Sequence, residues 1–473
     1  MATKKDLVEA HAFTRRRLVT AFLSGAPGGR EVEPSRPGGM VVGGIALGVL
    51  LIAGAAVGSV LSPRSAADWE NPGLILSKDT GERYVITEES TGDDPDIRPV
   101  INVTSAQLIL GVDVEPTLIQ QDALDQITPG ADIGILGAPQ QLPTSEDFVN
   151  TGWTACTAAA RVGEPVSDGL KISAASRPDV RPTPNEAFLV AEGAGKRLTY
   201  WLIAEADDPE DPSAPPRASR FKLGPDVGDD LMEQLNLVAK DTARVVSPQY
   251  LSLFPEGPEL TRGSFGLRGE GTPASGCARV GDLLQAGDRF YVYTSGAPWR
   301  LTPFEAAVYQ ATHPSAQVHD GPAPGNTVEV EATKGWPSRI PTGAPRGELC
   351  GVLHTGEGEP PYVTLASDPG DDASAAEVPP GSREAVMEPG HGALVTSGDW
   401  AATTSDSIFV VDNQAKAYSL VGTTTLENLQ YDPDEAPLVP DPWVKSLNKG
   451  IQLSTELALC PPALEPNDSQ ECE

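Results

Sequence analysis

One glycine-rich stretch, residues 193–197, comes nearest to a phosphate-binding loop in this sequence. Such a loop requires the pattern G-x-x-x-x-G-K followed by Ser or Thr; its backbone amides cradle the phosphates and the hydroxyl holds Mg²⁺. The stretch reads Gly-Ala-Gly-Lys-Arg, so the first glycine of the pattern and the hydroxyl residue are both absent. Because apolar runs flank it on both sides, the stretch is predicted to be the turn of a β-hairpin.

Patterns for nucleophilic and metal-dependent chemistry are also missing. No G-x-S-x-G occurs, and an S-x-x-K match at residues 219–222 has no companion motif. The histidines lack the H-E-x-x-H spacing of a zinc site, so each is expected in a loop or at the surface. They are His11, His313, His319, His354 and His391. Carboxylates are too numerous for one catalytic pair to be singled out, so we predict no catalytic, metal-binding or cofactor-binding residues.

The five cysteines are too few for a disulfide-rich scaffold, and none has the C-x-x-C spacing typical of zinc sites. They are Cys156, Cys277, Cys350, Cys460 and Cys472. Cysteines pair in oxidising compartments and stay reduced in the cytoplasm. If the bulk of the chain lies outside the cytoplasm, pairing is expected with one thiol left over.

The formal net charge of −32 is unevenly distributed along the chain. Residues 1–39 hold seven Lys/Arg against four Asp/Glu, whereas residues 62–473 hold 27 Lys/Arg against 62 Asp/Glu. A body with this charge repels phosphates, which argues against a nucleic-acid partner. Its acidic clusters lie among Pro, Gly and Ser and lack the ligand spacing of a cation site, so they are interpreted as solvated loops.

Residues 40–61 form an apolar segment without a charged side chain. As a helix it would be about 33 Å long, enough to cross the roughly 30 Å hydrocarbon layer of a bilayer. Basic residues precede the segment, so the positive-inside rule places the N-terminus in the cytoplasm and residues 62–473 outside. Ser65-Ala66-Ala67 could serve as a signal cleavage site, but a secretory signal has a shorter apolar core and a shorter preceding stretch. A single-pass anchor is therefore preferred.

Residues 4–24, in front of the span, are predicted to form a helix. Leu7, Leu18 and Phe22 recur near one side of it, while residues 15–17 are three arginines that spread around the rest. A helix of this kind can dock on a cytoplasmic partner or lie on the anionic inner leaflet. The sequence does not separate these two roles.

A recurring pattern extends from residue 70 to residue 450: an apolar run, a polar turn that often contains Gly, a second run and a Leu-rich segment. Each copy predicts a β-hairpin followed by a short helix that covers one of its faces. The runs and Leu-rich segments are 74–76, 84–86 and 103–110; 188–190, 200–203 and 231–238; 290–293, 299–301 and 304–309; and 408–411, 418–421 and 426–429. A lone hairpin is marginal in water, so these units must pack on one another or on a shared sheet.

A shorter segment also recurs, because residues 255–261 resemble residues 447–454 and residues 128–133 are a fainter version. Outside the hairpin copies, alternating runs such as 327–332 and 362–365 are typical of strands. These runs are assigned to a central β domain.

The predicted fold class is α+β and mostly β, with a single transmembrane helix followed by an elongated extracytoplasmic body. In that body, hairpin–helix repeats surround the central β domain. The predicted organisation is a cytoplasmic basic segment (1–39), a transmembrane helix (40–61), repeats (62–149, 188–312 and 396–459), a two-part central β domain (150–187 and 313–395) and a polar tail (460–473).

Five stretches carry a family likeness. They read EAHAFTRRRL at 9–18, GERYV at 81–85, RPVINVTSAQLILG at 98–111, IGILGAP at 133–139 and WTAC at 153–156. With a single apolar span between the first two, they resemble EccB proteins of type VII secretion. The resemblance covers nearly the whole chain and is densest over residues 1–156; its most specific part is the P-V-x-N-x-x-S-A pattern.

The resemblance implies a structural subunit of the actinobacterial type VII (ESX) inner-membrane complex, alongside EccC, EccD and EccE. EccC, an FtsK/SpoIIIE-like ATPase, would power export, and the outer bodies are expected to self-associate. The family's outer part is held by a disulfide, which the resemblance places between Cys156 and Cys350. Cys460 and Cys472 would then form a local pair and leave Cys277, although a pairing that uses Cys277 stays open.

Two other functions are alternatives to a structural subunit. ATP hydrolysis has been attributed to EccB proteins, but the sequence lacks a phosphate loop and cytosolic ATP would lie across the membrane from the body. A membrane-anchored nucleotide or cell-wall hydrolase would lose turnover when a single carboxylate is substituted. A cell-wall-binding anchor would instead be retained on purified peptidoglycan.

Overall fold

The protein is represented by a computed structural model. It describes residues 4–24, 71–87, 96–112, 115–165, 168–195, 197–208, 211, 213–274, 278–402 and 404–463. The chain forms two compact units, residues 1–64 and 65–473. In the first, helix α1 (Lys4–Ser24) has the predicted bounds. No helix among the described residues is both long and apolar enough to cross a bilayer, and the predicted span at 40–61 lies outside them.

Four sheets of the second unit share one topology. In each, three antiparallel strands form a meander, a helix follows, and a fourth strand pairs in parallel with the first. The strands therefore lie in the order third, second, first, fourth. A parallel pair needs a crossover connection, which the helix provides. We number these units repeats 1 to 4 along the chain.

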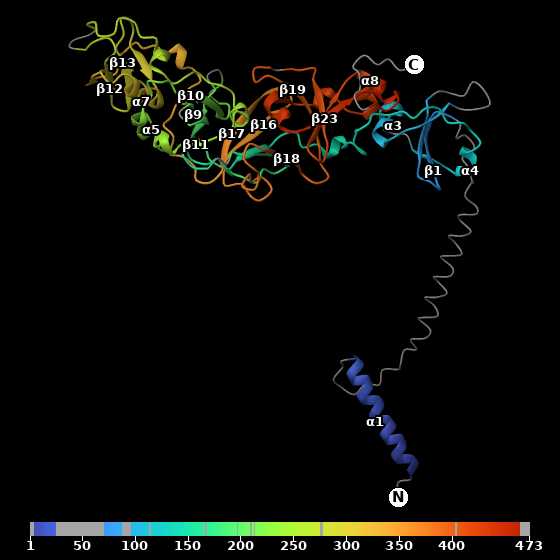
Figure 1. Cartoon of the computed structure of the whole chain (residues 1–473). Coiled ribbons are helices and arrows are strands. Elements are labelled where there is room, and N and C mark those ends of the chain that lie inside the picture. Colours follow the sequence, from blue (N-terminus) through green and yellow to red (C-terminus); the bar gives the residue numbers. More distant parts are fainter. Residues whose placement is uncertain are drawn as a thin grey trace. The chain divides into compact units, whose positions relative to one another are not determined.

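Figure 1 labels some of the helices and strands of each repeat. Repeat 1 contains β1 (Gly73–Ser77), β2 (Arg83–Ile86), β3 (Ile97–Pro99), α3 (Val103–Leu110) and β4 (Thr117–Ile119). Repeat 2 contains β8 (Ala187–Ala194), β9 (Arg197–Ala206), β10 (Arg217–Lys222), α5 (Asp229–Gln234) and β11 (Arg244–Val245). Repeat 3 contains β12 (Leu283–Ala286), β13 (Arg289–Val292), β14 (Trp299–Leu301), α7 (Pro303–Thr312) and β15 (Val318–Asp320). Repeat 4 contains β19 (Ala393–Gly398), β20 (Ile408–Val411), β21 (Lys416–Leu420), α8 (Thr423–Leu429) and β22 (Leu438–Pro440).

Each repeat ends with a closing segment that runs parallel to its third strand. In repeat 4 this segment is a full strand, β23 (Asn448–Leu453), beside β21. In the other repeats it is reduced to bridges, which pair Val100 with Ile133, Arg220 with Glu256, Leu223 with Leu260, and Trp299 with Val328. The recurring segments 128–133, 255–261 and 447–454 therefore occupy equivalent places, as their sequence similarity predicts.

Short helices complete the repeats. After the fourth strand come α4 (Gln121–Leu124), α6 (Pro248–Ser252) and α9 (Asp441–Ser446), and after β23 comes α10 (Thr455–Ala458). Single 3-10 turns occupy Ser145–Asp147, Lys240–Thr242, Arg262–Phe265, Glu331–Thr333 and Pro433–Glu435.

A six-stranded sheet is built from two separate stretches of the chain, with the strand order β18-β6-β5-β16-β17-β7. Its strands are β5 (Trp153–Thr157), β6 (Leu170–Ala174), β7 (Arg181–Pro182), β16 (Leu349–Gly356), β17 (Glu359–Ser367) and β18 (Arg383–Met387). β5 and β16 are neighbours, although repeats 2 and 3 separate them in sequence. We call this the central sheet.

The repeats differ from the sequence prediction in alignment. The first two predicted hairpins are strands one and two of their repeats, but the third and fourth are strands two and three. The shift arises because the predicted copies omit the first strands of repeats 3 and 4, β12 and β19.

The strand-like run at 362–365 lies in β17, whereas the strand predicted at 327–332 is wrong. Val328 makes one bridge to Trp299, and a 3-10 turn begins at Glu331. The alternation of polar and apolar residues at 327–332 therefore serves the closing segment of repeat 3. Residues 318–320, which the predicted boundaries put in the central domain, form β15 of that repeat.

Three apolar cores join neighbouring sheets. Repeats 1 and 4 share the core that contains Leu108 and Tyr418. The largest core joins the central sheet to repeats 2 and 4, with Trp153 and Trp443 buried in it. Repeats 2 and 3 share a core. Each joint therefore buries apolar surface, which is the main favourable term in packing such units together.

Candidate functional site at the disulfide and the joints between repeats

The disulfide implied by the family resemblance lies in the central sheet. Cys156 on β5 and Cys350 on β16 are directly opposite in an antiparallel pair, and their Cα atoms are 4.1 Å apart. The two residues are separated by 194 positions in sequence. The bond therefore closes a loop of the chain that contains β6, β7 and the whole of repeats 2 and 3.

The surroundings of the disulfide are apolar and shielded from water. Both cysteines are 0% exposed and pack with Val352, Ala366 and Ala373. Thiol–disulfide exchange requires a thiolate to reach one of the two sulfur atoms. Since neither sulfur is accessible in the folded protein, this bond holds two strands together and does not take part in exchange.

Of the remaining three cysteines, only Cys460 lies among the described residues. Cys460, at the end of α10, is 4% exposed and disulfide-bonded. Cys472, its expected partner, and Cys277 lie outside the described residues.

Two of the stretches that carry the family likeness contact each other. Asn102 caps the N-terminus of α3, with its Oδ1 accepting from Ser105 N at 2.8 Å. Asn102 Nδ2 donates to Ile135 O at 2.9 Å, and Ile135 N donates to Ser105 Oγ at 2.9 Å. Beside this pair, Gly134 N donates to Cys460 O at 3.0 Å, which ties repeat 1 to the end of repeat 4. The motif residues therefore organise the joint between repeats 1 and 4.

The same joint is completed at the C-terminal end of α3. The last carbonyls of an α-helix have no partner inside the helix. Asn428 Nδ2 on α8 donates to Leu108 O at 2.7 Å, and Thr455 Oγ1 on α10 donates to the same oxygen at 2.9 Å. In return, Val112 N donates to Asn428 O at 3.0 Å. Repeat 4 thus caps a helix of repeat 1.

We predict that Asn428→Ala lowers the free energy of unfolding of residues 65–473 by about 1–2 kcal/mol. The reason is that Leu108 O loses one of the two side-chain donors that Asn428 and Thr455 supply. Urea unfolding measures the change. Asn413→Ala, at an exposed position in the β20–β21 turn, is the control and should unfold at the wild-type midpoint. Equal midpoints for both variants would contradict a role for Asn428 in the joint.

Repeat 4 also contacts repeat 2 through α9 and α6. Trp443 is 0% exposed, and its indole Nε1 donates to Leu253 O at 3.0 Å. Gln249 Nε2 donates to Ser446 Oγ at 3.2 Å. A buried indole needs a hydrogen-bond acceptor as well as apolar neighbours, so this pair fixes the relative position of the two helices.

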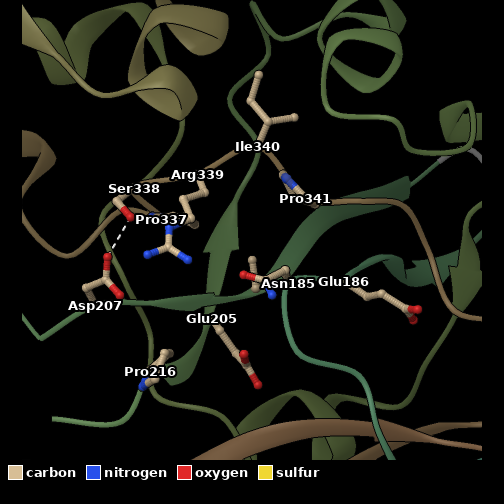
Figure 2. A pocket seen from close by; sticks show the side chains of 11 residues that line it. Asn185, Glu186, Glu205, Asp207, Pro216, Pro337, Ser338, Arg339, Ile340 and Pro341 are labelled. Atoms are coloured by element: carbon tan, nitrogen blue, oxygen red, sulfur yellow. Dashed lines mark hydrogen bonds between the residues drawn. The ribbon is translucent and has the colours of Figure 1, made fainter. Parts of the chain in front are cut away.

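A small cleft lies between repeat 2 and the segment 337–341 that returns from repeat 3 (Figure 2). Its carboxylates diverge: Ser338 Oγ donates to Asp207 Oδ2 at 2.5 Å, whereas Glu205 Oε1 accepts from Leu365 N at 2.9 Å. Its volume is about 80 Å³, while pockets for drug-sized ligands measure about 300–1,000 Å³. The cleft can hold water but not a nucleotide.

Burial raises the pKa of the Glu205 carboxyl, while hydrogen bonds from the backbone of Leu365 and Asn185 oppose the shift. A carboxyl whose pKa is higher in the folded state than in the unfolded state favours folding at low pH. Its contribution is full below the unfolded pKa and is lost as the pH rises through the folded pKa. Glu205→Gln keeps an oxygen acceptor and removes the buried charge.

We therefore predict that Glu205→Gln unfolds at a higher urea concentration than wild type at pH 7 and at the same concentration at a pH below the unfolded value of about 4.3. The same substitution at Glu359, which is exposed on β17, should leave both midpoints unchanged. Loss of stability in Glu205→Gln at pH 7 would mean that the bond from Leu365 requires the charged carboxylate.

The nearest match to a phosphate loop is the turn predicted from the sequence. Ala194 at the end of β8 pairs with Arg197 at the start of β9, which leaves a loop of two positions between the strands. Gly195 has a φ of +62°, the left-handed conformation that a two-residue hairpin loop requires. The S-x-x-K match lies within β10, paired along β9. Neither pattern begins a helix, as phosphate and nucleophile motifs do.

The prediction that every histidine lies in a loop or at the surface is wrong for His319 and His354, which lie on strands, while His313 lies in a loop but is buried. His313 is 2% exposed at the end of α7, where its ring stacks on Tyr309 at 4.0 Å between centroids. Burial lowers the pKa of His313. His319 and His354 are partly buried on β15 and β16. Within the described part of the chain, no three His, Cys, Asp or Glu side chains gather as metal ligands would.

Sequence reasoning missed the residues that join the repeats. Asn428 and Trp443 each bond a backbone carbonyl of another repeat. The available signal for Asn428 was positional: it lies within the Leu-rich helical segment 426–429, where a polar amide is expected to need a partner.

Residues 1–462 match the family model of the type VII secretion system ESX-1 transport TM domain B, EccB. Among curated relatives, the ESX-2 secretion system ATPase EccB2 of Mycobacterium tuberculosis is 24% identical over 429 residues, which are 82% of this chain and 81% of the relative. The ESX-3 secretion system ATPase EccB3 of the same species is 28% identical over 211 residues, 43% of this chain. That second match spans only 34% of the relative's length.

Solved structures share this fold. A chain of an intact ESX-5 inner membrane complex aligns with a TM-score of 0.62 and 21% identity, covering 100% of this chain and 98% of that one. The EccB3 dimer from the ESX-3 core complex aligns with a TM-score of 0.62 and 19% identity, covering 82% of this chain and 100% of that one. Since the family model spans almost the whole sequence, this chain belongs to the EccB family of type VII secretion.

Proposed function

We propose that this chain is a structural subunit of a type VII (ESX) inner-membrane complex and supports protein export across the cell envelope. The observation that carries the proposal is membership of the EccB family over residues 1–462. The repeat architecture supports it, because four sheets joined through buried cores offer extended surface for assembly. A chain with the same fold occurs in an intact ESX-5 inner membrane complex.

In this proposal residues 40–61 cross the inner membrane once, the N-terminus is cytoplasmic and residues 62–473 lie in the cell envelope. The apolar segment and the charge difference across it support this topology. An EccC-like FtsK/SpoIIIE ATPase, EccD and EccE would be the membrane partners. Contacts between outer bodies would form a self-associated assembly, as in the EccB3 dimer of the ESX-3 core complex.

The test is gentle detergent extraction of the tagged full-length chain, followed by native sizing and mass spectrometry. We expect one large particle that contains an FtsK-like ATPase and a multi-span subunit. A chain that migrates alone, or with itself only, would argue against a subunit of a larger complex. A variant without residues 62–473 should abolish export; normal secretion by that variant would also reject the proposal.

ATP hydrolysis is a second candidate function, because the curated relatives carry the word ATPase in their names. The nearest phosphate-loop match of this chain is a hairpin turn, which favours the structural role. Purified full-length protein is therefore expected to hydrolyse ATP no faster than a preparation in which Lys196 is replaced by Ala. Turnover above that of the Lys196→Ala variant would favour the enzyme.

A further inference from the structure

Helix α1 exposes an unusual amount of apolar surface. Every side chain from Lys4 to Val19 is exposed, and the large apolar ones include Leu7 at 69%, Leu18 at 63% and Phe13 at 54%. In proteins most helical stability comes from packing of an apolar face rather than from intrinsic propensity. The exposed apolar side chains of α1 therefore favour a surface on which the helix can lie.

The apolar residues of α1 fall mainly on one side. Leu7 and Leu18 are eleven residues apart, as are Val8 and Val19. Eleven residues are close to three helical turns, so the two pairs lie above one another at a rise of about 16 Å. Phe13 falls on the opposite side, at about 240° from Leu7 around the axis. We call Leu7, Val8, Leu18 and Val19 the apolar stripe.

The basic side chains of α1 distinguish between a protein groove and a lipid surface as the partner of the apolar stripe. Arg15 lies on the same side, between the two ends of the stripe, and borders the hollow lined by Leu7, His11 and Leu18. A dry protein groove would bury that guanidinium at a large desolvation cost. Lipid headgroups instead offer phosphate oxygens at the depth where an arginine can extend from an apolar helix side. The helix carries five Lys/Arg against two Asp/Glu.

We propose that α1 lies on the anionic cytoplasmic leaflet of the membrane, with the apolar stripe among the lipids and its basic side chains at the phosphates. The proposal rests on the proposed function, in which residues 40–61 anchor the chain. Fifteen residues separate Ser24 from Met40, so the helix end stays within about 50 Å of the membrane. This tether keeps the local concentration of the leaflet high, and an interfacial helix then needs only modest intrinsic affinity.

The test uses the full-length chain in nanodiscs of phosphatidylcholine alone and in nanodiscs with phosphatidylglycerol added. Backbone hydrogen exchange of residues 4–24 is followed by mass spectrometry. Exchange is expected to slow by about tenfold or more in the anionic discs, and added salt should reverse part of this effect. Equal exchange in the two kinds of disc would overturn the proposal.

Two variants separate the stripe from the helix itself. Leu7→Gln/Leu18→Gln keeps helix propensity and should lose the lipid-dependent protection, whereas the control Phe13→Gln should keep it. Protection that ignores lipid charge and needs the native complex would identify a protein partner instead and overturn the proposal. If the chain does not enter nanodiscs, that result argues only against the proposed transmembrane segment 40–61. In that case, co-sedimentation of the chain and its variants with vesicles that contain phosphatidylglycerol, against vesicles of phosphatidylcholine alone, tests the binding of α1 to anionic lipid.

Discussion

Replacement of Cys156 and Cys350 together by alanine is expected to lower the free energy of unfolding of residues 65–473 by about 2–5 kcal/mol. The chain-entropy model gives about 5 kcal/mol for a loop of this length, and measured values are usually smaller. The sequence separation of 194 is the physical reason, because the unfolded chain gains the freedom of the whole loop. Because both cysteines are fully buried, their replacement by alanine also removes packing contacts of the sulfur atoms, which lowers the free energy of unfolding further.

Urea unfolding under oxidising conditions measures this loss. Wild type and the double variant are also both unfolded in a strong reductant, which removes the bond of Cys460 from both samples and leaves wild type with both sulfur atoms but without their bond. We expect the midpoint of reduced wild type to approach that of the reduced double variant. A double variant with the oxidised wild-type midpoint would show that the central sheet holds repeats 2 and 3 without the bond.

Substitution of Gly134 by alanine should cost about 2–4 kcal/mol, a large effect for one methyl group. Gly134 has a φ of +125°, where side chains other than glycine are strained. A Cβ atom there would lie 2.7 Å from Ile101 Cγ1 and 3.1 Å from Ser105 Oγ, the atom that accepts the bond from Ile135. The added methyl would therefore disturb the joint between repeats 1 and 4.

The control lies three residues further along. Gly137 also has a positive φ, +86°, but the nearest heavy atom to an added Cβ would be Ile451 Cδ1 at 3.8 Å. Gly137→Ala should therefore cost only the backbone strain, about 1 kcal/mol. Comparison of urea midpoints separates crowding from strain. Equal losses in the two variants would mean that the contact with Ile101 and Ser105 does not constrain the joint.

Local features of the fold could be predicted from the sequence because they depend on nearby residues. The turn at 193–197 and helix α1 follow from spacing and flanking runs. The similarity of 255–261 to 447–454 predicts a shared position that the closing segments occupy. Edge strands such as β3 and β15 could not be predicted, because three residues show no clear period and gain their pairing from a neighbour.

The joints could be predicted only in part. The pairing of Cys156 with Cys350 came from the family resemblance, since spacing alone cannot select one pair among five cysteines. The bonds that Asn428 and Trp443 make to other repeats depend on tertiary packing. They bring together residues up to 320 positions apart, and no local sequence pattern encodes such a distance.

The insertion of repeats 2 and 3 between β5 and β16 has a consequence for biogenesis. A growing chain delivers β5 and β6, which pair with each other, but their other neighbours, β16 and β18, arrive only after two complete repeats have been made. Those two repeats have their own core and can fold in the interval. The central sheet and the joint of repeat 1 must wait for the last quarter of the chain, a high contact order that slows folding. Truncated chains would therefore expose two unfinished edges at once, which makes them ready substrates for quality-control proteases.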